Sequence, residues 1–374
     1  MLKLNKRENT LAILNYENFD KMPVVEFGYW GETVDKWAAE GHIDRSLAEG
    51  YKTRGDESDA HRAIMKRLGF DFSWTAMAGM NTWFSENFER KVLKENDDGS
   101  CVICDEMGLI CMVKPGVDSI PAEIGTTLTG REAWENFYKY RFEKFKERVD
   151  LEFFKKIDFG DMPRGLHIGS LMGKIRNMTG VAQLSYLYAD DPDLYKEIID
   201  TVGSLALYCT EIAMQSEIKF DFAHYWEDIC FKNGPLVIPS VFSELVGPWY
   251  KKISELLNKN GVNIISLDCD GLIDSLLPIW LENGVNTMFP IEYGTWEASL
   301  TPWRQKYGKR LRGVGGMNKN VFAKDKRAVD DEIERLKPIM QLGGYIPCPD
   351  HRIPPDADFA LVQYYCDKIQ NIRL

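Results

Sequence analysis

The segment Gly261-Val262-Asn263-Ile264-Ile265-Ser266-Leu267-Asp268-Cys269-Asp270-Gly271 decides the fold. Residues 261–265 are typical of a short buried strand, and the apolar spacing over 272–282 predicts a helix directly after it. In an extended chain residues two apart share a face, so Asp268 and Asp270 should point the same way, with Cys269 opposite. A strand that ends in carboxylates and turns into a helix is how α/β barrels present reactive groups.

The composition predicts a cytoplasmic protein with small or neutral partners. The 374 residues are 44% hydrophobic and carry a net charge of −11, with a pI near 5.2. An acidic surface argues against a general nucleic-acid binder. No apolar run approaches the ~20 residues of a membrane span, and the N-terminus lacks a signal-peptide core. The eight cysteines are scattered, so we expect reduced, structural thiols.

Alternating strand and helix patterns predict an α/β fold, a (β/α)8 TIM barrel, as one domain over 1–374. From residue 129 onward about six strands alternate with helices, including a charged helix over 132–156, and 23–27 and 71–76 supply two more strands. Residues 1–70 hold an N-terminal extension, with an opening helix over 5–19, and the first strand. Residues 84–120 form a small antiparallel insertion with a hairpin at Asp97-Asp98-Gly99-Ser100. A doubly wound open sheet is the alternative, but Gly28-Tyr29-Trp30-Gly31 does not fit its glycine-rich turn.

Polar groups gather at the predicted carboxyl ends of these strands, where a barrel places its reactive residues. They are His167, His224, Glu227, Asp228, Asp268, Asp270, Glu292, Asp350 and His351. Acids with imidazoles suit a zinc-type site or general acid–base chemistry. Aromatic residues near the same ends, Tyr29, Trp30, Trp74, Trp226 and Tyr293, fit an apolar ligand wall as well as core packing.

Structural roles are the alternative for each polar group. His167 could cap a helix or satisfy a core hydrogen bond. Glu227 and Asp228 could begin a helix, Asp268 and Asp270 could belong to a plain turn, and His351 could join a surface ion pair.

At these residues the chain resembles the uroporphyrinogen decarboxylase superfamily, which includes corrinoid-dependent methyltransferases. The resemblance covers nearly the whole chain and implies a (β/α)8 barrel. Its marks are Pro23–Trp30, Gly169-Ser170-Leu171 with Arg176 and Gly180, Trp226-Glu227-Asp228 with Gly234-Pro235, Asp268–Gly271, Pro290-Ile291-Glu292, Gly315–Lys319, Gly343–Pro347, Asp350-His351 and Pro354-Pro355-Asp356.

Two departures from the family pattern distinguish between the decarboxylase and methyltransferase activities that the resemblance implies. The decarboxylases carry arginines after the first strand, and 27–33 here has none, so a tetracarboxylate substrate would lack its clamps. The methyltransferase branch often holds zinc with a His-x-Cys pair and a later cysteine. By this resemblance, the zinc-ligand positions of the family fall on Asp268, Asp270 and His351 of this chain. Carboxylates and imidazole are harder ligands than thiolates. The resemblance therefore implies a methyl ether or another O- or N-methyl donor rather than a thiol.

The leading interpretation is a methyltransferase for O-demethylation, which moves a methyl group from a small, methoxylated aromatic donor to the corrinoid of a separate carrier protein. The assigned roles are metal ligation, with zinc as the candidate, by Asp268, Asp270, His351 and Glu292; acid–base catalysis by Glu227, Asp228 and His224; and donor binding by Tyr29, Trp30, His167, Trp226 and Tyr293. The corrinoid is expected on a partner because the chain has no Asp-x-His-x-x-Gly motif. The resemblance also implies a homodimer. A decarboxylase or lyase with a histidine proton donor, and a barrel that binds without catalysis, remain as alternatives.

Overall fold

Parallel strands form the centre of the molecule. The computed structural model describes residues 3–114 and 121–373. The sheet runs in the order β15-β14-β13-β12-β9-β8-β3, while β1 pairs with β2 and contacts β15. The bounds are β1 Val25–Glu26, β2 Phe72–Ser73, β3 Met77–Gly79, β8 Gly165–Gly169, β9 Phe222–Trp226, β12 Ile264–Asp268, β13 Thr287–Ile291, β14 Arg312–Met317 and β15 Tyr345–Pro349. A parallel bridge between Tyr29 and Ile353 links the two edges.

This arrangement is a TIM-barrel-like α/β fold, as the sequence predicts. The spatial order of the strands follows their order in the chain, with no reversal such as a doubly wound sheet requires. The second predicted strand, 71–76, is split between β2 and β3. All five residues of β12 are buried, which is typical of a strand covered on both faces.

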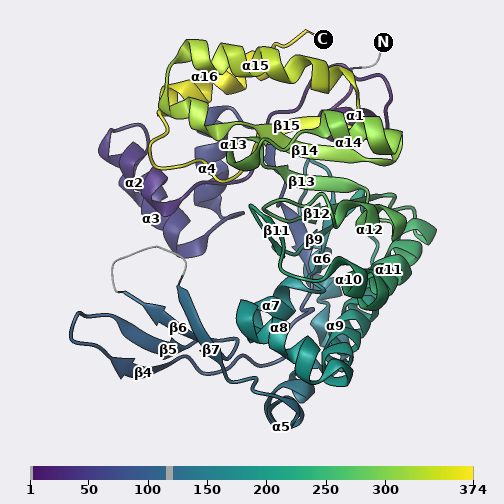
Figure 1. Cartoon of the computed structure of the whole chain (residues 1–374). Helices are drawn as coiled ribbons and strands as arrows, with labels where there is room; N and C mark the ends of the chain where they lie inside the picture. The colour runs from purple at the N-terminus through teal and green to yellow at the C-terminus, as the bar shows by residue number, and fades with distance from the viewer. Residues whose placement is uncertain (1–2, 115–120, 374) are drawn as a thin grey trace.

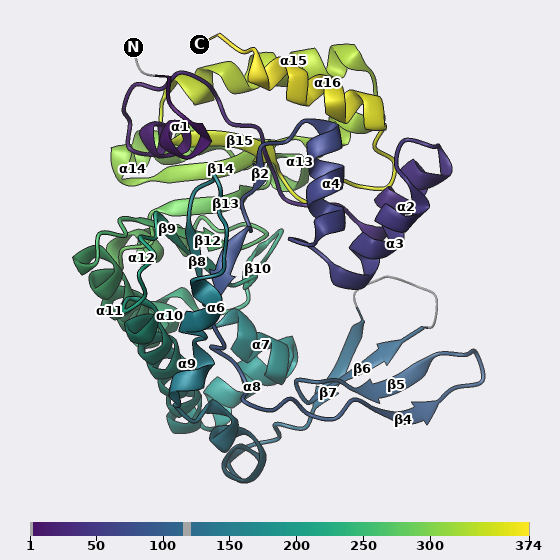
Figure 2. The same ribbon diagram turned by 180° about the vertical axis from the view of Figure 1, so that it is seen from behind.

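Helices cover the outside of the sheet (Figures 1 and 2). They are α1 Lys6–Leu14, α2 Gly31–Ala39, α3 Arg45–Arg54, α4 Asp59–Leu68, α5 Arg131–Ala133, α6 Leu151–Phe154, α7 Gly173–Thr179, α8 Val181–Asp190, α9 Pro192–Ala213, α10 Pro239–Leu245, α11 Gly247–Lys259, α12 Leu277–Glu282, α13 Tyr293–Trp296, α14 Leu300–Tyr307, α15 Lys326–Gln341 and α16 Phe359–Gln370. Their ends follow local signals: α9 starts at the Asp191 cap with Pro192 behind it. Within the described residues, no helix combines the length and apolarity needed to cross a membrane.

The predicted insertion is a four-stranded antiparallel sheet that projects from the barrel (Figure 1). Its strands are β4 Lys91–Glu95, β5 Cys101–Cys104, β6 Leu109–Val113 and β7 Ala122–Thr126. The hairpin at 97–100 joins β4 to β5, where Asp98 Oδ1 accepts from the Ser100 amide. The sheet continues past the predicted limit of 120, and 115–120 lie outside the described residues.

Three predicted helices differ from the structure. The opening helix ends at Leu14 rather than residue 19, and the helix after the decisive segment begins at Leu277 rather than residue 272. The helix predicted over 132–156 is broken into short turns. Arg141 and Arg148, which lie within this predicted helix, are buried and donate to backbone carbonyls. Their guanidinium groups stabilise an irregular path that helix periodicity cannot predict.

Candidate functional site

Three carboxylates meet where β9 and β12 end. One oxygen from each of Asp228, Asp268 and Asp270 can be chosen so that all three lie within 4.8 Å of one another. β9 and β12 are paired neighbours, with Asp268 opposite Trp226. Asp228, two residues after the end of β9, therefore reaches Asp268, the last residue of β12, and Asp270, two residues beyond it. We call these three side chains the carboxylate cluster.

Backbone geometry brings the cluster together. The Glu227 amide donates to the Asp268 carbonyl at 2.8 Å, and the Asp270 amide donates to Asp228 Oδ1 at 3.0 Å. Asp228 has a φ of +46°, a conformation that aspartate tolerates better than most residues and that often occurs at functional sites. Gly271 has a φ of +85°, and a Cβ there would lie 2.8 Å from the carbonyl oxygen of Cys230. Glycine is thus required where the chain turns away from the acids.

The cluster is short of positive charge. Burial, and then the neighbouring Asp228 and Asp270, raise the pKa of Asp268 well above its usual range. Burial followed by the charge of Asp270 raises the pKa of Asp228 to about 7. Asp270 Oδ1 is buried without a hydrogen-bond partner in the described part of the chain. An orphaned oxygen among crowded acids fits either a bound divalent cation or shared protons, so the cluster could hold a metal.

His351 borders the cluster, as the sequence predicts. Its Nε2 lies 3.3 Å from Asp270 Oδ2. Trp30 stacks on its ring with centroids 5.7 Å apart, and Phe27 meets it edge-on at 5.3 Å. Trp30 is 37% exposed, so part of its indole is accessible to a ligand. The imidazole is therefore held between the acids and an aromatic wall.

The next residue anchors this segment to the N-terminal extension. Arg352 forms a two-pronged ion pair with Asp56, next to the Tyr51 hydroxyl. Burial would lower the pKa of Arg352, but its bond to Asp56 outweighs burial and raises it. The backbone that carries His351 is thus attached to α3 and α4 through a charged hydrogen bond.

Glu292 lies beside the cluster but is engaged by the turn. Its Oε2 accepts from the Gly271 amide at 2.6 Å and its Oε1 from the Thr295 hydroxyl at 3.1 Å. Burial, and then Asp270, raise its pKa. It falls outside the three-residue group, so its contacts favour positioning of the turn after Asp270 over the predicted metal ligation.

Glu227 is placed for structure rather than for acid–base catalysis. Its carboxylate accepts from three successive backbone amides, Leu171, Met172 and Gly173, at 2.7–2.8 Å. The hydroxyls of Ser170 and Tyr250 complete its shell. The approach is close: a Cβ on Gly173 would lie 1.9 Å from the Glu227 carbonyl oxygen. The carboxylate anchors the start of α7 and all its lone pairs are engaged, which weighs against the predicted catalytic role.

The two predicted histidines lie inside the barrel, with ring centroids 6.0 Å apart. His224 is fully buried, and burial holds its pKa well below the usual range; its Nδ1 lies 3.0 Å from Ser266 Oγ. A neutral imidazole is a poor proton donor at neutral pH, which weighs against the predicted acid role. His167 is half-buried, and burial, with a contribution from Lys174, lowers its pKa to about 4. Its Nδ1 accepts from the Gly169 amide, so Nε2 carries the proton.

Of the predicted aromatic wall, Trp30 and Trp226 remain. Tyr29 is buried against Trp37, Tyr51 and His61 and points toward the N-terminal helices, which weighs against its predicted role in donor binding. Tyr293 is covered by Arg335, whose Cζ lies 3.6 Å from the ring centroid. That contact turns Tyr293 toward α15. The β1 strand is only two residues long, so alternation could not predict the direction of Tyr29.

Two cations of α7 were not assigned a role by the sequence. Lys174 Nζ lies 5.3 Å from the Trp83 ring centroid, and Arg176 Cζ lies 5.9 Å from that of Trp226. Burial lowers the pKa of Lys174 to about 8. The available signal was two basic residues in the first turns after β8, the strand that carries His167.

Comparisons with known proteins support the fold. A methyltransferase from Methanosarcina mazei has a similar structure, with a TM-score of 0.60, 14% identity and 98% of each chain covered. The likeness is one of fold alone. The putative vitamin-B12-independent methionine synthase from Listeria monocytogenes (13% identity, TM-score 0.40) and the B12-independent methionine synthase from Shewanella sp. W3-18-1 (9%, 0.47) each cover 94% of this chain over 98% of their own; these scores are too low to carry an argument. No family model matches the chain, and neither does any curated protein.

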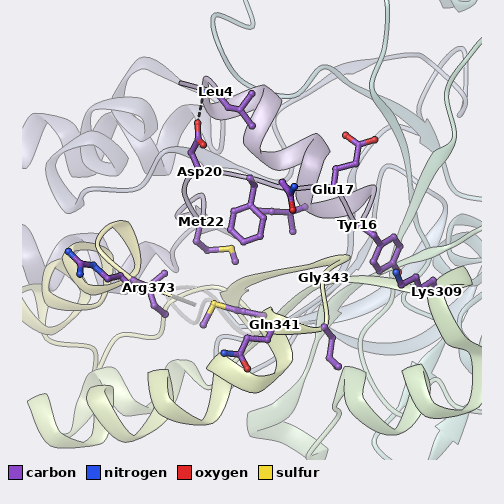
Figure 3. A pocket seen from close by; sticks show the side chains of 15 residues that line it. Leu4, Tyr16, Glu17, Asp20, Met22, Lys309, Gln341, Gly343 and Arg373 are labelled. Carbon is purple, nitrogen blue, oxygen red and sulfur yellow. Dashed lines mark hydrogen bonds between the residues drawn. The ribbon is translucent and has the colours of Figure 1, made fainter. Parts of the chain in front are cut away.

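A large cavity lies at the other end of the barrel. Its volume is about 1000 Å³, and Tyr16, Met22, Lys309 and Gly343 are among its lining residues (Figure 3). These residues precede β1, β14 and β15, so the cavity faces the amino ends of the strands. That face usually serves stability rather than catalysis.

Proposed function

We propose that the chain transfers a methyl group from a small methoxylated aromatic donor to the corrinoid of a separate carrier protein. The carboxylate cluster carries this proposal, because it lies at the carboxyl ends of the barrel strands beside His351 and the partly exposed Trp30. Trp30 and Trp226 supply aromatic surface on which a flat donor can pack.

The reaction breaks the O–CH3 bond. The methyl group leaves without the bonding electron pair, which stays on the ether oxygen, so negative charge develops there. A positively charged group beside that oxygen would stabilise the developing charge and so help the methyl group to leave.

A divalent cation fits the same residues. Asp228, Asp268 and Asp270 would hold it, with His351 as the nitrogen donor; Glu292 keeps the turn in place. Such an ion supplies Lewis-acid stabilisation of the leaving oxygen. Imidazole supports zinc as the candidate, while three carboxylates also suit harder cations.

The test combines the protein with a reduced corrinoid carrier and a panel of aryl methyl ethers, methylamines and betaines. The corrinoid absorption should change with an aryl ether and stay unchanged without the protein. An unchanged spectrum across the whole panel would rule out the proposal. Elemental analysis should find about one metal ion per chain in the purified protein and none after Asp270→Ala, while Asp274→Asn, which alters an exposed aspartate, keeps it.

A decarboxylase or lyase remains the second candidate, and the raised pKa of Asp228 favours it as a proton donor. Release of carbon dioxide from a small carboxylic acid, with no corrinoid present, would support that activity over methyl transfer.

A further inference from the structure

Three cations surround Tyr16 at the amino-terminal face of the barrel. The Cζ atoms of Arg304 and Arg312 lie 4.9 and 5.7 Å from the centroid of its ring, and Lys309 Nζ lies 5.1 Å from it. The ring is fixed in place, because its hydroxyl donates to a backbone carbonyl at 2.8 Å and a Cβ on Gly344 would lie 2.4 Å from ring carbon Cζ. The three side chains, which we call the cationic group, are therefore held around one rigid residue.

The cationic group lacks counterions. In the part of the chain that the structure describes, none of its members has a carboxylate oxygen within 4.0 Å. Arg304 donates to the backbone carbonyls of Leu342 and Gly343, and its Nε is buried without an acceptor. Burial lowers the pKa of Arg304, and the charge of Arg312 lowers it further. Desolvated cations without a counterion are unfavourable, so an anion that binds beside them would stabilise the fold.

The cavity at the amino ends of the strands lies beside this group. Tyr16 and Lys309 line it, and they lie together at one end, away from Arg373 (Figure 3). Leu342 and Gly343, whose carbonyls hold Arg304, belong to the same wall. The volume of about 1000 Å³ is at the upper end of the range for ligand pockets. Apolar side chains supply much of the remaining wall: Ile13, Phe19, Met22, Met340, Leu342 and Ile372.

Two acids in the same cavity limit the charge of a ligand. Asp20 lines it and accepts from the Leu4 amide at 2.7 Å, and Glu17 lines it next to Tyr16 in the chain. These carboxylates would repel a dianion such as phosphate more strongly than a single negative charge. The apolar wall favours burial of hydrocarbon. The lining therefore suits a singly charged anion that carries an apolar body.

We infer that this cavity binds an organic carboxylate with an apolar body, whose head lies beside the cationic group. Its hydrocarbon would lie along Met22, Met340 and Leu342. The ligand would bridge the segment that precedes β1 and the segment between α15 and β15, so binding should stabilise the docking of the N-terminal extension. The site lies at the opposite ends of the strands from the carboxylate cluster, so the inference goes beyond the proposed function.

The test titrates the full chain with octanoate and with its neutral counterpart octanamide. Calorimetry measures the two affinities. NMR of 13C-methyl methionine locates each probe, because Met22 and Met340 line the cavity and their signals can be assigned from Met22→Leu and Met340→Leu. We expect octanoate to bind at least ~10-fold more tightly than octanamide, and both probes to shift these two methyl signals.

Matched variants separate the charge from the apolar wall. Lys309→Met should weaken octanoate by about 10-fold and leave octanamide unchanged. Lys306→Met is the control: Lys306 is exposed on α14 with its Nζ 5.0 Å from the Tyr307 ring centroid, so the same charge is lost outside the cavity and both affinities should stay the same. Leu342→Gln should weaken both probes to a similar degree, because it removes apolar contact. Circular dichroism confirms that each variant folds.

Four results would overturn the inference. These are equal affinity for octanoate and octanamide, methyl shifts confined to methionines other than Met22 and Met340, equal losses of octanoate affinity in Lys306→Met and Lys309→Met, and inorganic phosphate that binds more tightly than octanoate. The readouts involve no corrinoid and no methyl donor. Failure of the proposed function would therefore leave this inference intact, and failure of this inference would leave the proposed function intact.

Discussion

Asp228 predicts an unusual pH dependence of stability in the metal-free protein. Its pKa in the folded protein is about 7, whereas an aspartate normally has a pKa of 3.8, because burial and Asp270 disfavour the ionised form. The folded state therefore holds a proton that the unfolded state has lost between these two pH values. Stability is fully present below pH ~4 and falls as the pH rises toward 7.

The magnitude follows from the size of the shift. A pKa that rises from 3.8 to about 7 corresponds to about 4 kcal/mol. Asp228 is only half-buried, so we expect solvent to reduce this to about 2 kcal/mol. The unfolding entropy of a 374-residue chain is about 0.8 kcal/mol/K, so the same energy moves Tm by about 2–3 °C.

Asp228→Asn removes this titration and keeps an oxygen to accept from the Asp270 amide. In chelator at pH 8 the variant should unfold about 2–3 °C above the wild type, and at pH 4 the two should coincide. Asp274→Asn serves as the control, since Asp274 is exposed and accepts from Trp303. Saturating zinc should reverse the order, because only the wild type retains all three carboxylates. Calorimetry that finds the variant less stable at pH 8 in chelator would refute the reasoning.

Three further variants probe the surrounding contacts. Glu227→Gln places an amide against three backbone N–H groups, so we expect a loss of about 3 kcal/mol in urea unfolding, and an unchanged midpoint would show that the anchor is unimportant. Trp30→Ala removes the exposed indole beside His351; KM for an aryl ether should rise about 10-fold with kcat nearly constant, and an equal fall in kcat would contradict a purely binding role. Arg352→Met breaks the ion pair with Asp56 and should weaken metal binding by about 10-fold in calorimetric titration, because the His351 segment loses its anchor. An unchanged affinity for the metal would contradict a role of the anchored His351 segment in metal binding.

The barrel itself was predictable because its signals are local. The run 264–268 is apolar and ends in an acid, and the strands that flank it repeat this pattern along the chain. Strand ends converge in a parallel barrel, so the approach of His351 to Asp270 follows from topology although the two residues are 81 positions apart. The carboxylate pair and its histidine neighbour could thus be found without coordinates.

The remaining differences come from tertiary contacts. Asp228 joins the cluster through a left-handed turn, which nothing in its neighbours specifies. The Glu227 carboxylate accepts hydrogen bonds from backbone amides of the preceding βα unit. Its position just after a strand suggested a reactive acid, whereas in the structure it anchors a neighbouring segment of backbone. Lys174 was overlooked because a basic residue in a helix is usually solvated, and only the surrounding packing shows that it is half-buried without an acceptor.

The central claim is that the carboxylate cluster supports methyl transfer through a bound divalent cation. The most direct test follows a 13C-labelled methyl group from an aryl methyl ether to the corrinoid carrier, with chelator-treated protein before and after one equivalent of zinc. The account predicts transfer only after zinc is added, and none in Asp268→Asn under either condition. Full transfer by the chelated protein, or undiminished transfer by Asp268→Asn, would contradict it.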